Sequence, residues 1–167
     1  MLKRIFFALL PIGVMGLIFF FSSQPYEQQD LRPTMKIYIP LDLLKPLLEP
    51  IEFTYHGETV NVENRGVAGM LDFLIRKAAH LTVFFLLMAS MFLALVYNTT
   101  WSFARVLTVS YIGTVLYACF DEYHQSLTPN RTPYAGDVVL DSFGGVIALL
   151  FIGFVYWRKK KRQQHAT

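Results

Sequence analysis

The sequence is poor in cysteine and lacks the motifs that would assign it to a common enzyme class. Its 167 residues include one cysteine, Cys119, so no internal disulfide can form. That cysteine lies inside an apolar run, where we expect a small buried hydrophobic residue. No internal repeat or low-complexity segment is present. The Walker loop, the nucleophile elbow and the zinc-protease motif are also missing.

Charged residues are absent from four stretches, which are 5–21, 81–104, 106–120 and 142–157. A transmembrane helix needs about 20 mostly apolar residues, with about 17 near the lower limit. The third stretch reaches this length if residues 99–104 extend it and Arg105 snorkels to the headgroups. With 54% hydrophobic residues, the sequence predicts an all-α membrane protein. We expect one domain, residues 1–167, forming a four-span transmembrane helix bundle with spans at about 5–22, 78–97, 102–120 and 138–157.

Acidic residues are absent from one side of this predicted bundle. If the amino terminus is cytoplasmic, the cytoplasmic segments hold no Asp or Glu, and all twelve acidic residues lie on the other side. The same cytoplasmic segments hold eight basic residues: Lys3, Arg4, Arg105, Arg158, Lys159, Lys160, Lys161 and Arg162. The positive-inside rule therefore places both termini in the cytoplasm and the 121–137 loop outside. The run at 158–162 is typical of a stop-transfer anchor that contacts anionic membrane lipids, and no nucleic-acid partner is expected.

The first span and the segment after it complete the expected topology. No clear small-x-small cleavage site follows residue 21, so we favour an uncleaved first span over a signal peptide. The outer insert, residues 23–77, contains five prolines between residues 25 and 50 that preclude a long helix there. Within it, residues 41–48 favour a short amphipathic helix, and residues 52–62 favour a β-hairpin with its turn near Gly57. We interpret this insert as a lid or a partner surface.

Polar residues are concentrated between the third and fourth apolar stretches and at the start of the second. Such groups are costly in a bilayer unless they face its surface or a polar cavity, so the cluster predicts a functional site. On a helix that continues past Phe120, Asp121, His124 and Gln125 would share one face, and Glu122 would point elsewhere. Asp137 and Asp141 lie one turn apart, and Gly144, Gly145 and Ala148 continue that face with small residues that allow close helix packing. Arg76 and Lys77 would both lie near His80.

These residues resemble the VanZ-like family of small bacterial membrane proteins. The likeness rests on Phe21-Ser22-Ser23-Gln24-Pro25, Lys77-Ala78-Ala79-His80, Asp121-Glu122-Tyr123-His124-Gln125, Arg131, Asp137, Asp141 and Gly144-Gly145. It leaves residues 26–70 largely unaccounted for, and Asp141 stands where many members are expected to have asparagine. The resemblance implies a four-span protein of the bacterial plasma membrane. It also implies a link to resistance against the glycopeptide teicoplanin through the founding member, without an established reaction.

The first functional hypothesis is an enzyme-like site for a lipid-linked or cell-wall precursor at the outer leaflet. His80 or His124 could act as general base or acid, and Asp121 or Glu122 could orient the imidazole or act itself. Ser22 or Ser23 is a conceivable nucleophile without a recognisable activating residue. The residues assigned to substrate binding are Arg76, Lys77, Gln125, Arg131, Asp137 and Asp141.

Four alternatives to this hypothesis can be weighed. The site could bind an amphiphilic antibiotic or an envelope component without catalysis. It could be structural, with Lys77 paired to Asp121 or Glu122, and Arg131 paired to Asp137 or Asp141. A metal could use ligands from Asp121, Glu122, His124 and Asp137 or Asp141, but these lack a diagnostic spacing and basic residues lie nearby, so we expect neither metal nor cofactor. Transport is less favoured, and the sequence leaves a homo-oligomer open.

Overall fold

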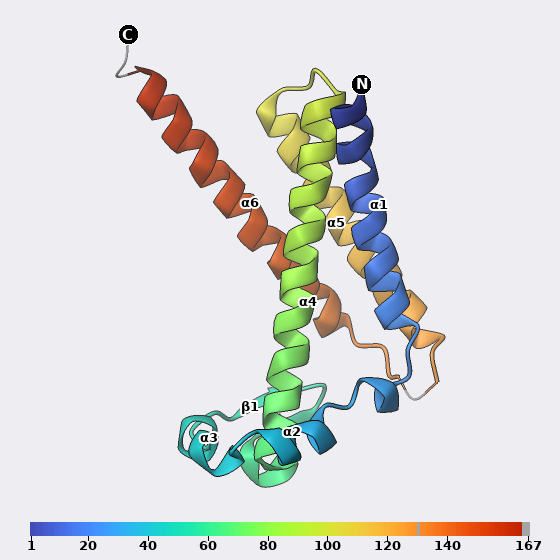
Figure 1. The fold of residues 1–167 in the computed structure, drawn as a ribbon, viewed down its shortest axis with the longest axis vertical. Coiled ribbons are helices and arrows are strands. Elements are labelled where there is room, and N and C mark those ends of the chain that lie inside the picture. The colour runs from blue at the N-terminus through green and yellow to red at the C-terminus, as the bar shows by residue number, and fades with distance from the viewer. Residues whose placement is uncertain (130, 165–167) are drawn as a thin grey trace.

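The computed structural model describes residues 1–129 and 131–164, and within them four helices are long and apolar enough to cross a membrane. They are α1 (Leu2–Ser22), α4 (Val62–Asn98), α5 (Phe103–Ser126) and α6 (Ala135–Gln164). Between α1 and α4 lie the 3₁₀ helix η1 (Tyr26–Gln29), α2 (Arg32–Tyr38), α3 (Leu41–Leu48), β1 (Phe53–Tyr55) and β2 (Glu58–Val60). The prediction of an all-α, four-span protein is therefore confirmed (Figure 1).

The helix that contains the second span is longer than its apolar stretch. It begins at Val62, where the Asn61 side chain accepts the Asn64 N–H at 2.8 Å and caps the first turn. Gly66 interrupts it with a φ of 67°, a conformation that suits glycine. From residue 67 to Asn98 it extends about 48 Å at 1.5 Å per residue, which exceeds a hydrocarbon core of about 30 Å. The first turns of α4 therefore project beyond the span and carry the insert.

The insert forms a small folded unit around the projecting part of α4. Strands β1 and β2 are antiparallel with Phe53 opposite Val60, and His56 and Gly57 form a two-residue turn with φ of 54° and 76°. Positive φ at both positions is the turn geometry that favours glycine at the second position, and the predicted hairpin is present. The predicted helix at 41–48 is present as α3. Helix α2 and η1 were not predicted. A cluster formed by Leu48, Val60 and Met70 attaches the insert to α4.

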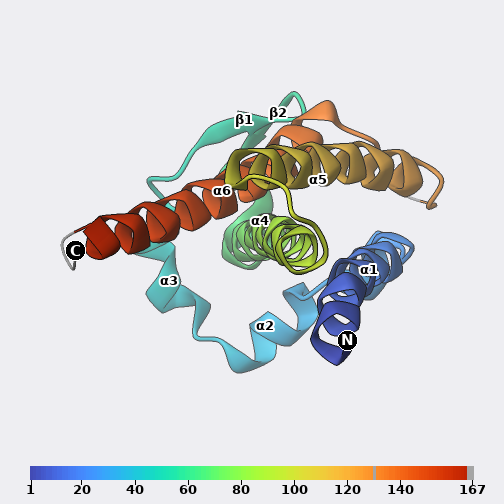
Figure 2. The same cartoon turned by 90° about the horizontal axis from the view of Figure 1, so that it is seen from above.

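The insert lies at one end of the bundle, and α1 begins at the other end (Figure 1). Helix α6 also runs toward the end where α1 begins, so the chain enters and leaves the bundle on the same side. Figure 2 shows α2 and α3 on one side of α4 and the hairpin on the other. The apolar core within the bundle contains Ile18, Phe84, Leu87 and Ala118.

Small residues bring α6 against α4 and α5, as the sequence predicted. A Cβ atom added to Gly144 would lie 2.5 Å from the backbone oxygen of Leu81, and one added to Gly145 would meet the side chain of Thr114 at 3.2 Å. Ala148 continues this face and is fully buried. Beyond the crossing, α6 leans away from the other three helices (Figure 1). The crossing holds the acidic start of α6 beside α4.

Candidate functional site

A cavity of about 750 Å³ lies at the insert end of the bundle, between α1 and α4. The hairpin and the segment before α6 supply further parts of its wall. Of the ten residues that the sequence predicted for the site, six line it: Arg76, Lys77, His80, Gln125, Arg131 and Asp137. The other four do not line it: Asp121, Glu122, His124 and Asp141.

Arg131 reaches the cavity from the segment between α5 and α6. Its Nη1 donates to Oε1 of Gln125 at 2.8 Å, and its Nη2 donates to Oε1 of Gln29 at 2.9 Å. Its Nε donates to the main-chain oxygen of Gln24 at 3.1 Å. Within the part of the chain that the structure describes, these donors meet neutral acceptors. Burial lowers the pKa of the Arg131 guanidinium, because a poorly hydrated surrounding disfavours its charge. An anion in the cavity would offset that effect.

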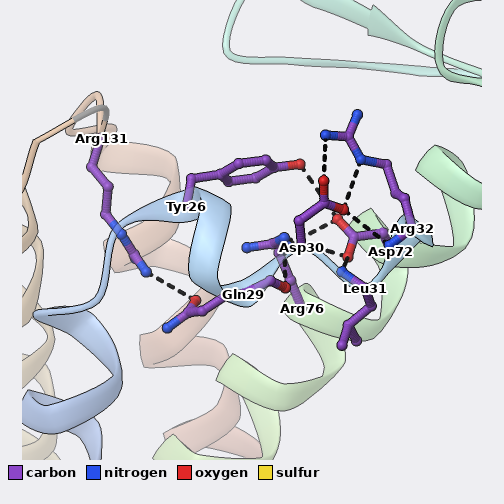
Figure 3. Close-up of polar contacts among 8 residues, drawn as sticks. All are labelled: Tyr26, Gln29, Asp30, Leu31, Arg32, Asp72, Arg76 and Arg131. Atoms are coloured by element: carbon purple, nitrogen blue, oxygen red, sulfur yellow. Dashed lines mark hydrogen bonds and ion pairs between the residues drawn. The ribbon is translucent and has the colours of Figure 1, made fainter. Parts of the chain in front are cut away.

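The segment that follows α1 links Arg131 to Arg76, a second arginine of the cavity wall (Figure 3). The side chain of Gln29 accepts from Arg131, and its main-chain oxygen accepts from Nη2 of Arg76 at 3.0 Å. Arg76 also donates from Nε to Oδ2 of Asp72 at 3.0 Å, and its guanidinium carbon lies 4.1 Å from the ring centre of Tyr26. These contacts orient Arg76 by hydrogen bonding and by a cation–π interaction. Helix η1 therefore positions both guanidinium groups.

Lys77 connects α4 to α6 and to the hairpin. Its Nζ forms an ion pair with Oδ1 of Asp137, and the hydroxyl of Tyr55 donates to the same oxygen. The Lys77 Nζ also lies 4.5 Å from the ring centre of Tyr55. Burial and the neighbouring Asp137 carboxylate raise the pKa of the Tyr55 phenol, so it remains a proton donor across the physiological range. These three residues form the part of the cavity wall where the hairpin meets the bundle.

Ser22 and Asp121 form a buried hydrogen bond between α1 and α5. The Ser22 hydroxyl, which lines the cavity, donates to Oδ1 of Asp121 at 2.5 Å. Oδ2 of the same carboxylate accepts from Nε2 of Gln125 at 2.8 Å. Gln125 also accepts a hydrogen bond from Arg131, so a chain of hydrogen bonds joins Ser22, Asp121, Gln125 and Arg131. The residue sequence offered no such partner for Ser22, since the two residues lie far apart along the chain.

His80 is held at the cavity wall by Asp141. Its Nδ1 lies 3.2 Å from Oδ1 of Asp141, whose residue exposure is 1%. His80, Asp121 and Asp141 each offer one potential metal-ligand atom, and these three atoms lie within 4.8 Å of one another. One imidazole with two carboxylates is a donor set suited to a divalent cation such as Mn²⁺ or Zn²⁺. This set differs from the one considered from the sequence, which contained His124 and Glu122 and lacked His80.

The structure corrects the predicted face of residues 121–125. Asp121 and Gln125 share it as expected. His124 also faces α1, but it stacks on Phe19 with ring centres 4.1 Å apart and does not line the cavity. Its Nδ1 is buried and has no hydrogen-bond partner among the described residues. Glu122 is buried as well, and its Oε1 accepts the main-chain N–H of Tyr134. His124 therefore stands apart from the cavity, and Glu122 fixes the approach to α6.

The ion pairs also differ from those that the structural alternative proposed. Lys77 pairs with Asp137 and not with Asp121 or Glu122, and Arg131 bonds to amides and not to Asp137 or Asp141. Sequence reasoning missed several residues of the site: Tyr26, Gln29, Tyr55 and Asp72. Asp72 carried a signal, because it precedes Arg76 by four residues on one helix. The other three are brought in by long-range contacts that leave no local pattern.

The fold and the site together define a multi-pass membrane protein with a mixed-charge cavity at one end of its helix bundle. The family model described as VanZ/LLP1 matches residues 7–156, and the chain belongs to that family. The match also includes the insert that the recognised motifs had left out. Neither a curated protein nor a solved structure matches the chain.

Proposed function

We propose that this protein is a plasma-membrane protein that binds an anionic, lipid-linked molecule of the bacterial envelope at the outer face. In this proposal the anionic headgroup, a phosphate, occupies the cavity between α1 and α4. Both termini are cytoplasmic, as the distribution of Lys and Arg supports. The family supports a link to glycopeptide resistance of the teicoplanin type.

The charge of the cavity wall supports an anionic ligand. The wall contains four basic side chains, Arg65, Arg76, Lys77 and Arg131, and two carboxylates, Glu58 and Asp137. Arg65 and Lys77 are the partners of those two carboxylates. Arg76 forms an ion pair with Asp72, which lies outside the wall. Among the described residues, Arg131 is therefore the basic side chain of the wall whose charge no carboxylate partner balances.

The observation that carries this proposal is that the Arg131 guanidinium faces the cavity with neutral hydrogen-bond partners. The guanidinium is partly buried, it lines the cavity, and its donors rest on amide and main-chain oxygens. A phosphate suits it because the planar guanidinium can donate two parallel hydrogen bonds to phosphate oxygens. The amide partners can release Arg131 to an anion at little electrostatic cost, whereas a carboxylate partner could not.

The hydrogen-bonded pairs behind the wall favour a second candidate, an acid–base reaction on the bound molecule. The Ser22 hydroxyl donates to the buried Asp121 carboxylate, and the His80 imidazole rests on Asp141. Ser22 and His80 both line the cavity, so a bound headgroup would meet a hydroxyl and an imidazole. This candidate requires the binding described above.

Native mass spectrometry tests the proposal directly. Protein extracted from bacterial membranes in mild detergent is expected to retain phospholipids with a net negative charge in preference to zwitterionic phospholipids, whose phosphate is neutralised by an ammonium group. The variant Arg131→Gln should retain them less. Equal retention of both lipid classes by the unmodified protein would contradict the proposal.

A further inference from the structure

The cavity opens into an apolar groove of about 370 Å³ that runs along α1. Three residues, Leu17, Val83 and Leu86, line both the cavity and the groove, so the two are continuous. The rest of the groove is lined by α1 alone, through Phe6, Leu9, Leu10, Gly13 and Val14. No residue of this lining carries a charge or a polar side chain. Polarity therefore falls from the arginines of the cavity to the hydrocarbon side chains of the groove.

Gly13 leaves open space in the wall of this groove. Gly13 lines it, and a Cβ atom added there would find no heavy atom within 4 Å. On either side of it α1 is packed: Phe7 stacks on Tyr97 with ring centres 4.0 Å apart, and Ile18 lies in the core cluster with Phe84. The open space lies along one face of α1, between residues 6 and 17. Leu9 and Leu17 beside it are more than half exposed, so the groove opens sideways toward the surrounding lipid.

We propose that the groove holds one hydrocarbon chain of the lipid whose phosphate occupies the cavity. This inference rests on the proposed function and adds the site of the chain. From Leu17 to Phe6 the groove extends about 16 Å along the helix axis at 1.5 Å per residue. That length is about half of a hydrocarbon core of about 30 Å, which is the depth of one leaflet. The groove is centred near the middle of α1, so a chain that enters it from the cavity would reach past the middle of the bilayer while its headgroup stays in the cavity.

The groove selects the chain by shape. Hydrocarbon in the bilayer is as apolar as leucine side chains, so moving a chain from lipid into the groove adds little hydrophobic driving force. The chain gains close packing, and a side chain that fills the groove would exclude it. An alkyl phosphate should therefore be sensitive to filling the groove, whereas a phosphate without a chain should not.

Two glycines of α1 provide a matched pair of variants for the test. Gly13 lines the groove and Gly16 does not, while neither has a heavy atom within 4 Å of an added Cβ. Leucine is a better helix former than glycine, so Gly13→Leu and Gly16→Leu should both preserve α1. The probes are hexadecyl phosphate and ethyl phosphate, measured by competition on purified protein in detergent. Gly13→Leu is expected to weaken the binding of hexadecyl phosphate at least tenfold and to leave the binding of ethyl phosphate unchanged. Gly16→Leu should bind both compounds as the unmodified protein does.

The other outcomes contradict different steps. If Gly13→Leu binds hexadecyl phosphate as tightly as the unmodified protein, the groove does not hold the chain. If Gly13→Leu weakens both phosphates equally, the substitution acts on the cavity and the chain is again not in the groove. A change of oligomeric state in Gly13→Leu, seen by mass photometry, would assign the groove to a second copy of this chain. If the unmodified protein binds neither phosphate, the proposed function fails first.

Discussion

Replacing Arg131 by glutamine removes the guanidinium on which the proposed anion site depends. Hydrogen bonds to a charged group contribute about 1.5–3 kcal/mol each, and each 1.4 kcal/mol corresponds to a factor of ten in affinity. Loss of one such bond to a phosphate should therefore raise the Kd for hexadecyl phosphate about 10- to 100-fold. Arg131→Lys keeps the charge without the planar fork and should give an intermediate Kd.

A neighbouring arginine supplies the control for this experiment. Arg32 is held by Asp30, with Nη2 2.7 Å from Oδ2, and it does not line the cavity (Figure 3). Arg32→Gln should therefore leave the Kd unchanged. The assay is competition of hexadecyl phosphate against a fluorescent alkyl phosphate, with membrane abundance and elution volume checked for each variant. If Arg131→Gln binds within twofold of the unmodified protein, the assigned anion site is wrong.

Two further predictions concern packing and buried polarity. Gly144→Ala should lower the melting temperature, since its Cβ would lie 2.5 Å from a backbone oxygen of α4. Overpacking of this kind costs about 1–3 kcal/mol. Gly153→Ala should leave the melting temperature unchanged, because the space around its Cβ is open. An equal melting temperature for both variants would refute the close helix crossing. Ser22→Ala should also destabilise the fold, because it takes a donor from the buried Asp121 carboxylate at a cost of about 1–3 kcal/mol. Ser23→Ala is the control, since that hydroxyl is exposed and donates to a main-chain oxygen of α1. The assay is thermal unfolding in detergent. If Ser23→Ala lowers the melting temperature more than Ser22→Ala, the buried Ser22–Asp121 hydrogen bond is excluded.

The features that could be predicted from the sequence are those set by local chemistry. Four uncharged stretches specify four spans, because no other regular structure in this composition satisfies the backbone within lipid. The hairpin could be predicted since Gly57 supplies the positive φ that its two-residue turn requires. The Gly144–Gly145 face could be predicted because small residues one turn beyond Asp141 have few roles other than close helix packing.

The site could be predicted in composition but not in its pairing. On an idealised helix of 3.6 residues per turn, positions 121 and 125 lie about 40° apart, whereas position 124 lies about 60° from 121 and about 100° from 125. Whether that offset faces the cavity or a neighbouring helix depends on where α1 packs, and Phe19 of α1 covers His124. Gln29 is a similar case: its two arginine partners come from α4 and from the segment after α5. A chain 167 residues long offers many polar pairs, and only the packing of α1 and η1 selects among them.

The comparison that tests the central claim most directly is between two amphiphiles of opposite charge and equal chain length. Hexadecyl phosphate and hexadecyltrimethylammonium share a chain that the groove would accept, and differ in the sign of the headgroup that would meet Arg76 and Arg131. Titration of the purified protein should give saturable binding of the phosphate and at least tenfold weaker binding of the ammonium. Equal binding of the two would contradict an anion-selective cavity.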